Sequence, residues 1–312
     1  MRTLTGPLQG VVTMMKRTCL CHAGLVPAAV TAFALACPAS EPIQPITVDK
    51  PLLAYWNFDD GESSPVADRS GNDYHAAPEG FQGGLSRTAG VFGRAMRFAG
   101  QHMVAVQGAG RPDFSTIEQI SFSAWVHMDK FDRYNEIFRK EDGNDRVLFS
   151  FQEDGTVLAL GLNVDGYVEC DARIDPKAIV GAGWRHCAAT YDGLAMRVYL
   201  DGVEIGVLNR PGKITAGGAA PGCIGSNKGG ECLQGTMDDL RVYSVALTAT
   251  EVAQLYANGI EAITMADKHV AEHLAKVYKR GDDFAETLAT VRRNLAEHKI
   301  TPSPKLVQVL QA

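Results

Sequence analysis

The sequence lacks an excess of basic residues. Its 312 residues include 30 Lys and Arg against 36 Asp and Glu, giving a formal net charge of -6 and a pI near 5.8. Nucleic-acid-binding domains are normally basic, so this balance argues against that class. No run of residues is long and apolar enough to form a transmembrane helix.

Motifs of several enzyme classes are missing as well. The sequence contains no Gly-x-Ser-x-Gly, no paired metal-binding histidines and no glycine-rich phosphate loop. No Cys-x-x-Cys spacing indicates a structural zinc site. Hydrolases with a nucleophile elbow, zinc proteases and nucleotide-binding enzymes are therefore not indicated.

The first 36 residues have the pattern of an export signal. Lys16 and Arg17 precede an apolar stretch over 23–36, which is shorter than a membrane span, and Ala34-Leu35-Ala36 fits a small-x-small cleavage site. We predict a signal peptide over 1–36 and a secreted or cell-envelope location. Cys37 follows directly and could instead carry a lipid anchor, although a bacterial lipobox prefers leucine at the position of Ala34. Cleavage of the signal peptide with release and lipid attachment at Cys37 are both compatible with the sequence.

Short alternating strands separated by turns fill the middle of the chain. After a linker over 37–50, residues 52–58 alternate as a strand with one apolar face. Five Asp-Gly pairs then separate short alternating runs, at Asp142-Gly143, Asp154-Gly155, Asp165-Gly166, Asp192-Gly193 and Asp201-Gly202. This spacing predicts antiparallel hairpins in an all-β sandwich over 51–259.

One of these strands, over 235–243, begins with a carboxylate pair beside a glycine. Strict alternation would point Asp238, Leu240 and Val242 one way and Asp239, Arg241 and Tyr243 the other. We therefore expect two charged oxygens at the rim of a sheet.

The C-terminal part, 260–312, has a helical pattern. Thr248 and Glu251 form a capping box, and Gly259 stands where a helix would end. Residues 264–299 carry two apolar stripes, interrupted at 281–283, which predict a helical hairpin. The stripes either pack on each other or on the sandwich, or they form a coiled coil that binds a partner.

Seven segments, in this order, carry a resemblance to a known family: Ala54-Tyr55-Trp56-Asn57-Phe58-Asp59, Asp68-x-Ser70-Gly71-Asn72, Gly93-x-Ala95-x-Arg97-Phe98, Phe122-Ser123-Ala124-Trp125-Val126, Trp184-Arg185-His186 with Tyr191-Asp192-Gly193, Arg197-Val198-Tyr199-Leu200-Asp201-Gly202, and 235–247 followed by Glu251 and Leu255-Tyr256. Together they resemble a laminin-G-like domain of the concanavalin A-like lectin/glucanase superfamily. The resemblance implies a two-sheet antiparallel jelly roll, and it fixes the fold more closely than the function.

The resemblance also allows a test for enzyme activity. Retaining glucanases of this superfamily carry Glu-x-Asp-x-Glu on one strand, which supplies an acid and a nucleophile on one face. The nearest match here is Glu169-Cys170-Asp171-Ala172-Arg173, where an arginine replaces the second glutamate. We therefore predict that the protein is not an enzyme, and that His186 is structural.

Calcium is the metal that the resemblance implies, because related jelly rolls hold this ion where the first and last strands meet. The oxygen donors that this chain offers there are Asp59, Asp68, Asn72, Asp238 and Asp239. In the alternative, Asp68 and Asn72 cap their own turn while Asp238 or Asp239 pairs with Arg241 or Arg97.

Three aromatic residues are candidates for ligand binding. Trp125 shares a strand face with polar residues, and Tyr134 and Tyr167 lie in expected loops. A tryptophan on a polar face can stack on a sugar ring, or it can be covered by another segment.

The cysteine count fits export. Four cysteines follow the signal region, and Cys223 and Cys232 flank a glycine-rich hairpin loop, which predicts a disulfide between them. Cys170 with Cys187 would be the second disulfide, with two buried thiols as the alternative.

The sequence thus predicts an exported, non-catalytic module that binds a glycan such as an extracellular polysaccharide. In a second hypothesis, the C-terminal helices bind a protein partner and the sandwich is passive.

Overall fold

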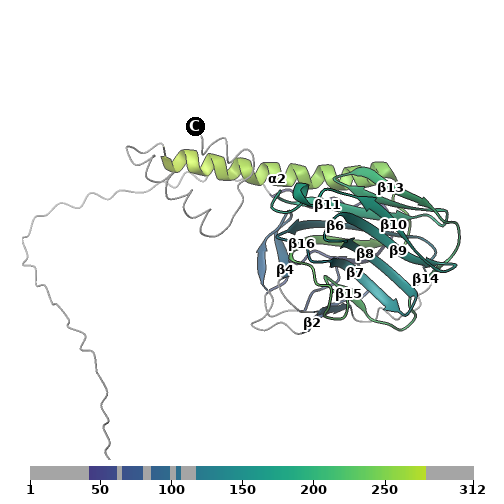
Figure 1. Cartoon of the computed structure of the whole chain (residues 1–312). Coiled ribbons are helices and arrows are strands. Elements are labelled where there is room, and N and C mark those ends of the chain that lie inside the picture. The colour runs from purple at the N-terminus through teal and green to yellow at the C-terminus, as the bar shows by residue number, and fades with distance from the viewer. Residues whose placement is uncertain (1–41, 62–64, 80–85, 99–102, 107–116, 279–312) are drawn as a thin grey trace, which may run out of the picture. The chain divides into compact units, whose positions relative to one another are not determined.

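The computed structural model describes residues 42–61, 65–79, 86–98, 103–106 and 117–278, with the side chains of 79, 103 and 273–278 excepted. The predicted signal peptide, Cys37 and the second predicted helix lie outside the described residues. The described part carries the strands and one helix (Figure 1).

Two antiparallel sheets form the sandwich. The first, sheet A, has the order β13-β12-β11-β6-β16-β4-β3, and β1 pairs with β16 beside β4. Its strands are β1 (Leu52–Trp56), β3 (Arg87–Ala89), β4 (Arg94–Phe98), β6 (Ile120–Met128), β11 (Arg185–Tyr191), β12 (Ala195–Leu200), β13 (Val203–Asn209) and β16 (Gly235–Tyr243). The bounds of β16 confirm the strand predicted over 235–243.

The second, sheet B, has the order β10-β9-β8-β7-β15-β5-β2, and β14 pairs with β9. Its strands are β2 (Ala76–Glu79), β5 (Met103–Val106), β7 (Tyr134–Asp142), β8 (Asp145–Gln152), β9 (Val157–Val164), β10 (Tyr167–Arg173), β14 (Ile214–Thr215) and β15 (Gly222–Ile224). A 3-10 turn, η1 (Pro176–Ala178), follows β10. All five Asp-Gly pairs lie at hairpin turns between consecutive strands, as predicted.

One hydrophobic core lies between the sheets. Alternate side chains point into it, so that on β6 Ile120, Phe122, Ala124 and Val126 are buried there while Trp125 belongs to a separate cluster on the outer face. The ring of Phe122 lies 5.4 Å from that of Phe138 on β7, joining the two sheets. The apolar alternation in the sequence therefore specifies which face of each strand is buried.

The helix α2 (Ala249–Tyr278) follows β16 and begins at the predicted capping box. Thr248 and Glu251 exchange side-chain-to-backbone hydrogen bonds at 2.8 and 3.3 Å. The prediction that the helix ends at Gly259 is wrong, because α2 is 30 residues long and continues past Gly259 to Tyr278 without a break. Gly259 instead lies where the helix packs on Trp125, and a Cβ atom there would be 2.1 Å from the Trp125 ring.

The segment before β1 packs on the sandwich instead of forming a loose linker. Val48 is buried with Leu247 and Val252, and Asn258 of α2 accepts a hydrogen bond from the Ile46 amide at 2.9 Å. Arg241 donates to the Ile46 carbonyl at 2.7 Å. No helix among the described residues is long and apolar enough to cross a membrane.

Candidate ligand-binding face

The carboxylate pair of β16 is buried, and the prediction that it lies at an open rim is wrong. Asp238 is 0% exposed and Asp239 3% exposed. The strand register shifts between Asp238 and Arg241, where Asp239 adopts a positive φ of 51°. This bulge lets β4 pair with the first part of β16 and β1 with the second. It also moves Asp238 off the face that Leu240 and Val242 share.

Asp238 holds a neighbouring turn in place. Its Oδ2 accepts a hydrogen bond from the Phe92 amide at 2.9 Å, and Gly90 approaches so closely that a Cβ there would lie 2.4 Å from the same oxygen. Oδ1 is buried without a hydrogen-bond partner. Burial, and then the charge of Asp239, raise the pKa of Asp238 well above its usual range.

The other predicted calcium ligands are occupied by protein donors. Asp68 accepts hydrogen bonds from the amides of Tyr55, Ser70 and Tyr74, each at 2.9 Å, and so closes its own turn. Asn72 donates to the Leu52 carbonyl at 2.9 Å.

Asp59 and Asp239 are likewise bound. Asp59 accepts from the Arg94 amide at 2.7 Å, and Asp239 pairs with Arg241 at 2.9 Å. Among the described residues, no three His, Cys, Asp or Glu side chains converge to hold a metal ion. The residues present therefore do not fit a calcium ion, and the contacts match the capped-turn and ion-pair alternative.

Trp125 lies beneath α2 and is 1% exposed. Its ring stacks on Tyr256 of α2 at 6.0 Å and lies 5.2 Å from His186. His186 is also fully buried, with Ser123 Oγ 2.9 Å from its Nε2, and burial lowers its pKa to about 3. A ligand could reach Trp125 only if α2 moved away. Trp125 is therefore covered by another segment, which was the alternative to sugar stacking.

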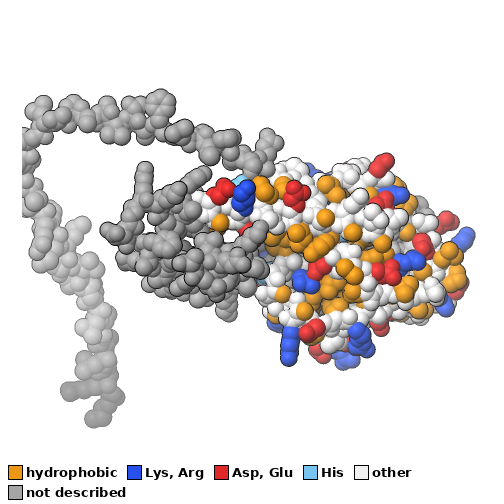
Figure 2. Space-filling view, turned by 90° about the horizontal axis from the view of Figure 1, so that it is seen from above, with side chains coloured by type: hydrophobic (Ala, Val, Ile, Leu, Met, Phe, Trp, Pro, Cys, Tyr) orange, Lys and Arg blue, Asp and Glu red, His pale blue; other side chains and the backbone are white. Residues whose placement is uncertain are grey.

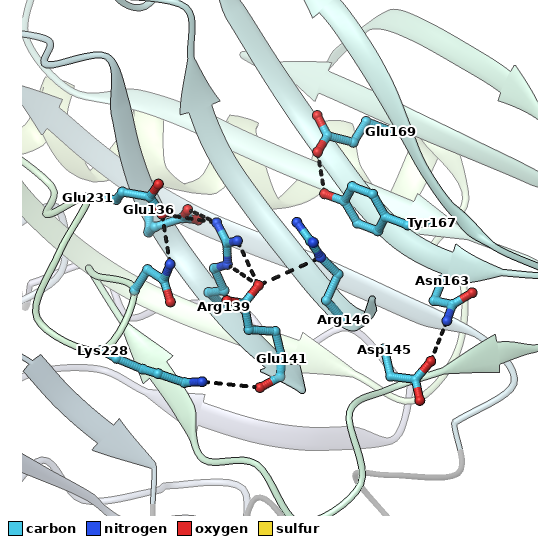
Figure 3. A network of polar contacts seen from close by, with 11 residues as sticks. Glu136, Arg139, Glu141, Asp145, Arg146, Asn163, Tyr167, Glu169, Lys228 and Glu231 are labelled. Carbon is cyan, nitrogen blue, oxygen red and sulfur yellow. Dashed lines mark hydrogen bonds and ion pairs between the residues drawn. The ribbon is translucent and has the colours of Figure 1, made fainter. Parts of the chain in front are cut away.

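A different polar surface lies on the outer face of sheet B, the face turned away from the core. Phe149 and Phe151 of β8 point into the core, so Leu148 and Ser150 point to the outer face. An acid–arginine cluster occupies this face (Figure 3), and its members are Glu136, Arg139 and Glu141 of β7, Arg146 of β8, and Glu231 of the β15–β16 loop.

Arg139 is the centre of the acid–arginine cluster. Its Nη1 lies 2.6 Å from Glu136 and 3.1 Å from Glu231, and its Nη2 lies 2.6 Å from Glu141. Glu141 also contacts Arg146 at 3.6 Å. One guanidinium thus binds three carboxylates, which fixes the positions of all four groups.

Tyr167, one of the predicted ligand-binding residues, continues this surface on β10. The Arg146 guanidinium lies 4.0 Å from its ring centroid, and its hydroxyl donates to Glu169 (Figure 3). One face of the ring is therefore covered by arginine. A ligand here would meet the edge of the ring, the Glu169 carboxylate and the guanidinium.

Tyr134, another predicted ligand-binding residue, lines a pocket of about 310 Å³. Its wall comes from the β6–β7 loop and the glycine-rich β15–β16 loop, and is formed by Asp132, Arg133, Tyr134, Gly230, Glu231, Cys232 and Gln234. Because Glu231 belongs to both, the pocket and the acid–arginine cluster adjoin. The structure thus brings together Tyr134 and the cluster, but not Trp125.

The strand that resembles the glucanase motif carries its residues on this outer face. Glu169, Asp171 and Arg173 alternate with Cys170 and Ala172, which lie in the core. Arg173 pairs with Glu153 at 2.6 Å, so a cation occupies the place of the second acid.

Neither predicted disulfide is present. Cys170 lies in the core, where its thiol donates to the Met196 carbonyl at 3.6 Å, and burial raises its pKa to about 11. Cys187 is also a core residue. Cys232 donates to the Gly229 carbonyl at 3.5 Å, within a loop closed by the Asn227–Gly230 bridge, while Cys223 lies within β15. The four cysteines therefore pack as buried thiols.

Sequence reasoning missed the acid–arginine cluster. Simple alternation puts Glu136 and Arg139 on opposite faces of a strand, but the register of β7 shifts between Glu136 and Phe138. This bulge brings residues three apart onto one face. The density of charged residues over 136–142 was the only available signal.

Comparisons with known proteins agree with this architecture. The family model described as concanavalin A-like lectin/glucanases superfamily matches residues 100–253. No curated protein matches the chain. Among solved structures, domain 4 of AbnA, a GH43 extracellular arabinanase from Geobacillus stearothermophilus, in complex with arabinotriose, is similar with 24% identity and a TM-score of 0.54, over 66% of this chain and 98% of that one.

Two further structures share the fold. One concerns the cell entry of botulinum neurotoxin type C and its interaction with two ganglioside molecules, with 15% identity and a TM-score of 0.50, over 68% of this chain and 51% of that one. The other is a receptor-binding domain with 14% identity and a TM-score of 0.51, over 67% and 51%. The match to 100–253 and the two-sheet sandwich show that this part of the chain is a laminin-G-like domain of the concanavalin A-like lectin/glucanase superfamily.

Proposed function

We propose that the protein is a non-catalytic module that binds a carbohydrate outside the cell. The observation that carries this proposal is the outer face of sheet B, where the acid–arginine cluster adjoins the pocket lined by Tyr134. Ligand sites combine concave apolar surface with a few fixed polar groups, and this face has both.

The chemistry of the face suits sugar hydroxyls. Carboxylates accept hydrogen bonds from hydroxyl groups, guanidinium groups donate to them, and a tyrosine ring packs on the C–H face of a sugar. Glu231 and Tyr134 supply two of these groups in one pocket.

The charge balance favours an uncharged glycan. With Glu136 left out because burial favours its uncharged form, the labelled residues of Figure 3 include four acids, namely Glu141, Asp145, Glu169 and Glu231, against Arg139, Arg146 and Lys228. Because carboxylates exceed cations here, an acidic polysaccharide would be repelled.

Three further points support binding without catalysis and an external location. The arginine at position 173 leaves β10 without the acid pair that a retaining glucanase needs. Domain 4 of the arabinanase, which shares the fold, is in complex with arabinotriose in its solved structure. The signal peptide predicted from the sequence supports a location outside the cytoplasm, as a secreted or lipid-anchored protein.

A protein-binding role for α2 is the second candidate. Val270 and Ile260 of α2 are large apolar residues that stay 47% and 38% exposed. In the view that looks down on the molecule, apolar side chains gather in patches among charged ones (Figure 2). A helix with exposed apolar residues can dock a partner.

Calorimetric titration of the full chain tests the proposal. The ligands would be soluble arabinan, xylan, mixed-linkage β-glucan and starch, with alginate as the acidic comparison. We expect binding to at least one neutral polysaccharide and none to alginate. Absence of binding to every polysaccharide would contradict the proposal and favour a protein partner for α2.

A further inference from the structure

We propose that a proton on Glu136 holds Glu231 in the wall of the pocket, so that the pocket binds its glycan best while Glu136 is protonated. The part of this inference that concerns glycan binding rests on the proposed function. The proton linkage itself stands on the contacts of Glu136, Arg139 and Glu231.

Arg139 cannot neutralise all the carboxylates that it binds. It contacts Glu136, Glu141 and Glu231, and the second guanidinium of the cluster, on Arg146, reaches only Glu141. Three carboxylates share two guanidinium groups. The cluster is electrically balanced when one carboxylate holds a proton, because isolated charges are costly in a desolvated site.

Glu136 is the carboxylate that is placed to hold this proton. Its side chain is 1% exposed, whereas those of Glu141 and Glu231 are 17% and 33% exposed. Burial disfavours the charged form most strongly at the least exposed group. Glu136 Oε2 also has no hydrogen-bond partner, and the hydroxyl of Ser150, its cross-strand neighbour, has none either. No donor therefore stabilises a negative charge on Oε2.

The charged groups around Glu136 come from three elements. In the described part of the chain they are Arg139 and Glu141 of β7, Arg146 of β8, and Glu231 and Lys228 of the β15–β16 loop. Lys228 binds the main-chain carbonyl of Glu141 at 3.5 Å, so it does not offset the carboxylate of Glu136. Burial, with Glu231 as a further contribution, raises the pKa of Glu136 to about 8, although Arg139 opposes the shift.

Glu231 is the group that transmits the change to the pocket. Its carboxylate lies beside Glu136 on the same Nη1 atom of Arg139, and its main-chain carbonyl accepts from the Glu136 amide at 3.0 Å. Asn227 Nδ2 also donates to Glu231 Oε2 at 2.9 Å, and the φ of Glu231 is 51°, a strained value for a residue other than glycine, so its position depends on all of these contacts. Loss of the proton puts two negative charges side by side and repels the partly exposed Glu231 from its place in the wall.

Carbon-13 NMR of the full chain labelled at glutamate carboxyl groups tests the linkage without a ligand. We expect one resonance to titrate near pH 8 and to vanish in Glu136→Gln. The resonance assigned by Glu231→Gln should shift with the same midpoint in the wild type and lose that step in Glu136→Gln. Glu204→Gln is the matched control, because Glu204 lies on sheet A and is paired with Arg197.

Calorimetry at pH 6 to 9.5, with the polysaccharide that binds best at pH 7, tests the effect on the pocket. For a single proton required for binding, we expect wild-type affinity to fall about tenfold between pH 7 and pH 9. Glu136→Gln should stay constant within about twofold, because glutamine keeps the uncharged form. Glu204→Gln should follow the wild type.

The NMR and calorimetry results distinguish a failure of the proton linkage from a failure of the glycan-binding function. A glutamate step near pH 8 without binding to any polysaccharide would contradict the proposed function and leave the proton linkage standing. Binding that is constant over this pH range, with no shared midpoint of Glu136 and Glu231, would overturn the inference and leave the glycan-binding function standing. If Glu136→Gln fails to fold, the Glu231→Gln variant tests the linkage by itself. If the two acids interact as proposed, the titration midpoint of Glu136 in Glu231→Gln should be lower than in the wild type by more than about one pH unit. An unchanged midpoint would overturn the inference.

Discussion

Gly259 of α2 lies directly against the indole ring of Trp125, and a Cβ atom at this position would be 2.1 Å from Cζ2. Glycine in the middle of a helix is normally unfavourable by about 1 kcal/mol relative to alanine. Here the missing side chain lets α2 approach the outer face of sheet A. We therefore expect Gly259→Ala to lower the free energy of unfolding by about 1–3 kcal/mol, as overpacking does.

Chemical denaturation measures that change. Trp125→Phe shrinks the ring, so the double variant should lose less stability than the sum of the two single variants. Ala257→Gly, at an exposed position of the same helix, is the control for propensity alone and should cost about 1 kcal/mol. An unchanged or increased stability of Gly259→Ala would show that α2 does not pack on Trp125 as described.

The raised pKa of Asp238 predicts that the stability of the protein depends on pH. Its folded pKa is raised above the ordinary value of 3.8, so its contribution is fully present below pH 3.8 and is lost as pH rises through the folded pKa. The Asp238→Asn variant lacks this loss. Its stability relative to the wild type should therefore increase with pH, by at most about 1.4 kcal/mol per pH unit.

Denaturation curves at pH 5, 6, 7 and 8 test this prediction. Because Glu136 titrates in both proteins, the difference between them isolates Asp238. Asp238→Ala should be less stable than Asp238→Asn by about 1–3 kcal/mol at every pH, since alanine leaves the Phe92 amide without its acceptor. Parallel stability profiles of the wild type and Asp238→Asn would contradict the account.

The contacts of Asp68 and Asp239 predict no response to calcium. A bound ion stabilises the native state, so a site would show itself as a higher melting temperature. We expect the same melting temperature with millimolar calcium and with a chelator. A rise with calcium that is lost in Asp68→Asn would restore the calcium prediction made from the sequence.

The four buried cysteines should react as thiols. Alkylation under denaturing, non-reducing conditions, followed by mass spectrometry, should label Cys170, Cys187, Cys223 and Cys232 to the same extent as after reduction. Labelling of these positions only after reduction would show that the disulfides predicted from the sequence form after all.

Local patterns in the sequence were sufficient to predict several of the strands and turns. The Asp-Gly pairs, the alternation of β6 and the Thr248–Glu251 capping box each depend on residues close in the sequence, and all are confirmed. The predictions failed where a distant residue decides. Gly259 reads as a helix end until Trp125, far away in the sequence, is seen beneath it.

The candidate site was harder to predict for a related reason. Bulges in β7 and β16 change which side chains share a face, and a bulge leaves no mark in simple alternation. Glu136 and Arg139 were therefore overlooked, while Asp238 was placed on the wrong face. Tyr134 was found because an aromatic residue beside polar ones is visible in the sequence itself, although Tyr134 and Tyr167 are the first residues of β7 and β10 and do not lie in the expected loops.

The most direct test of the glycan-binding account is calorimetry of Tyr134→Ala and Trp125→Phe at pH 7, with the neutral polysaccharide that the wild type binds. Tyr134 lines the pocket and Trp125 is buried under α2. We predict that Tyr134→Ala loses at least about tenfold in affinity, equivalent to about 1.4 kcal/mol, while Trp125→Phe binds as the wild type does. Unchanged affinity of Tyr134→Ala together with weakened binding by Trp125→Phe would contradict the account and place the site beneath the helix.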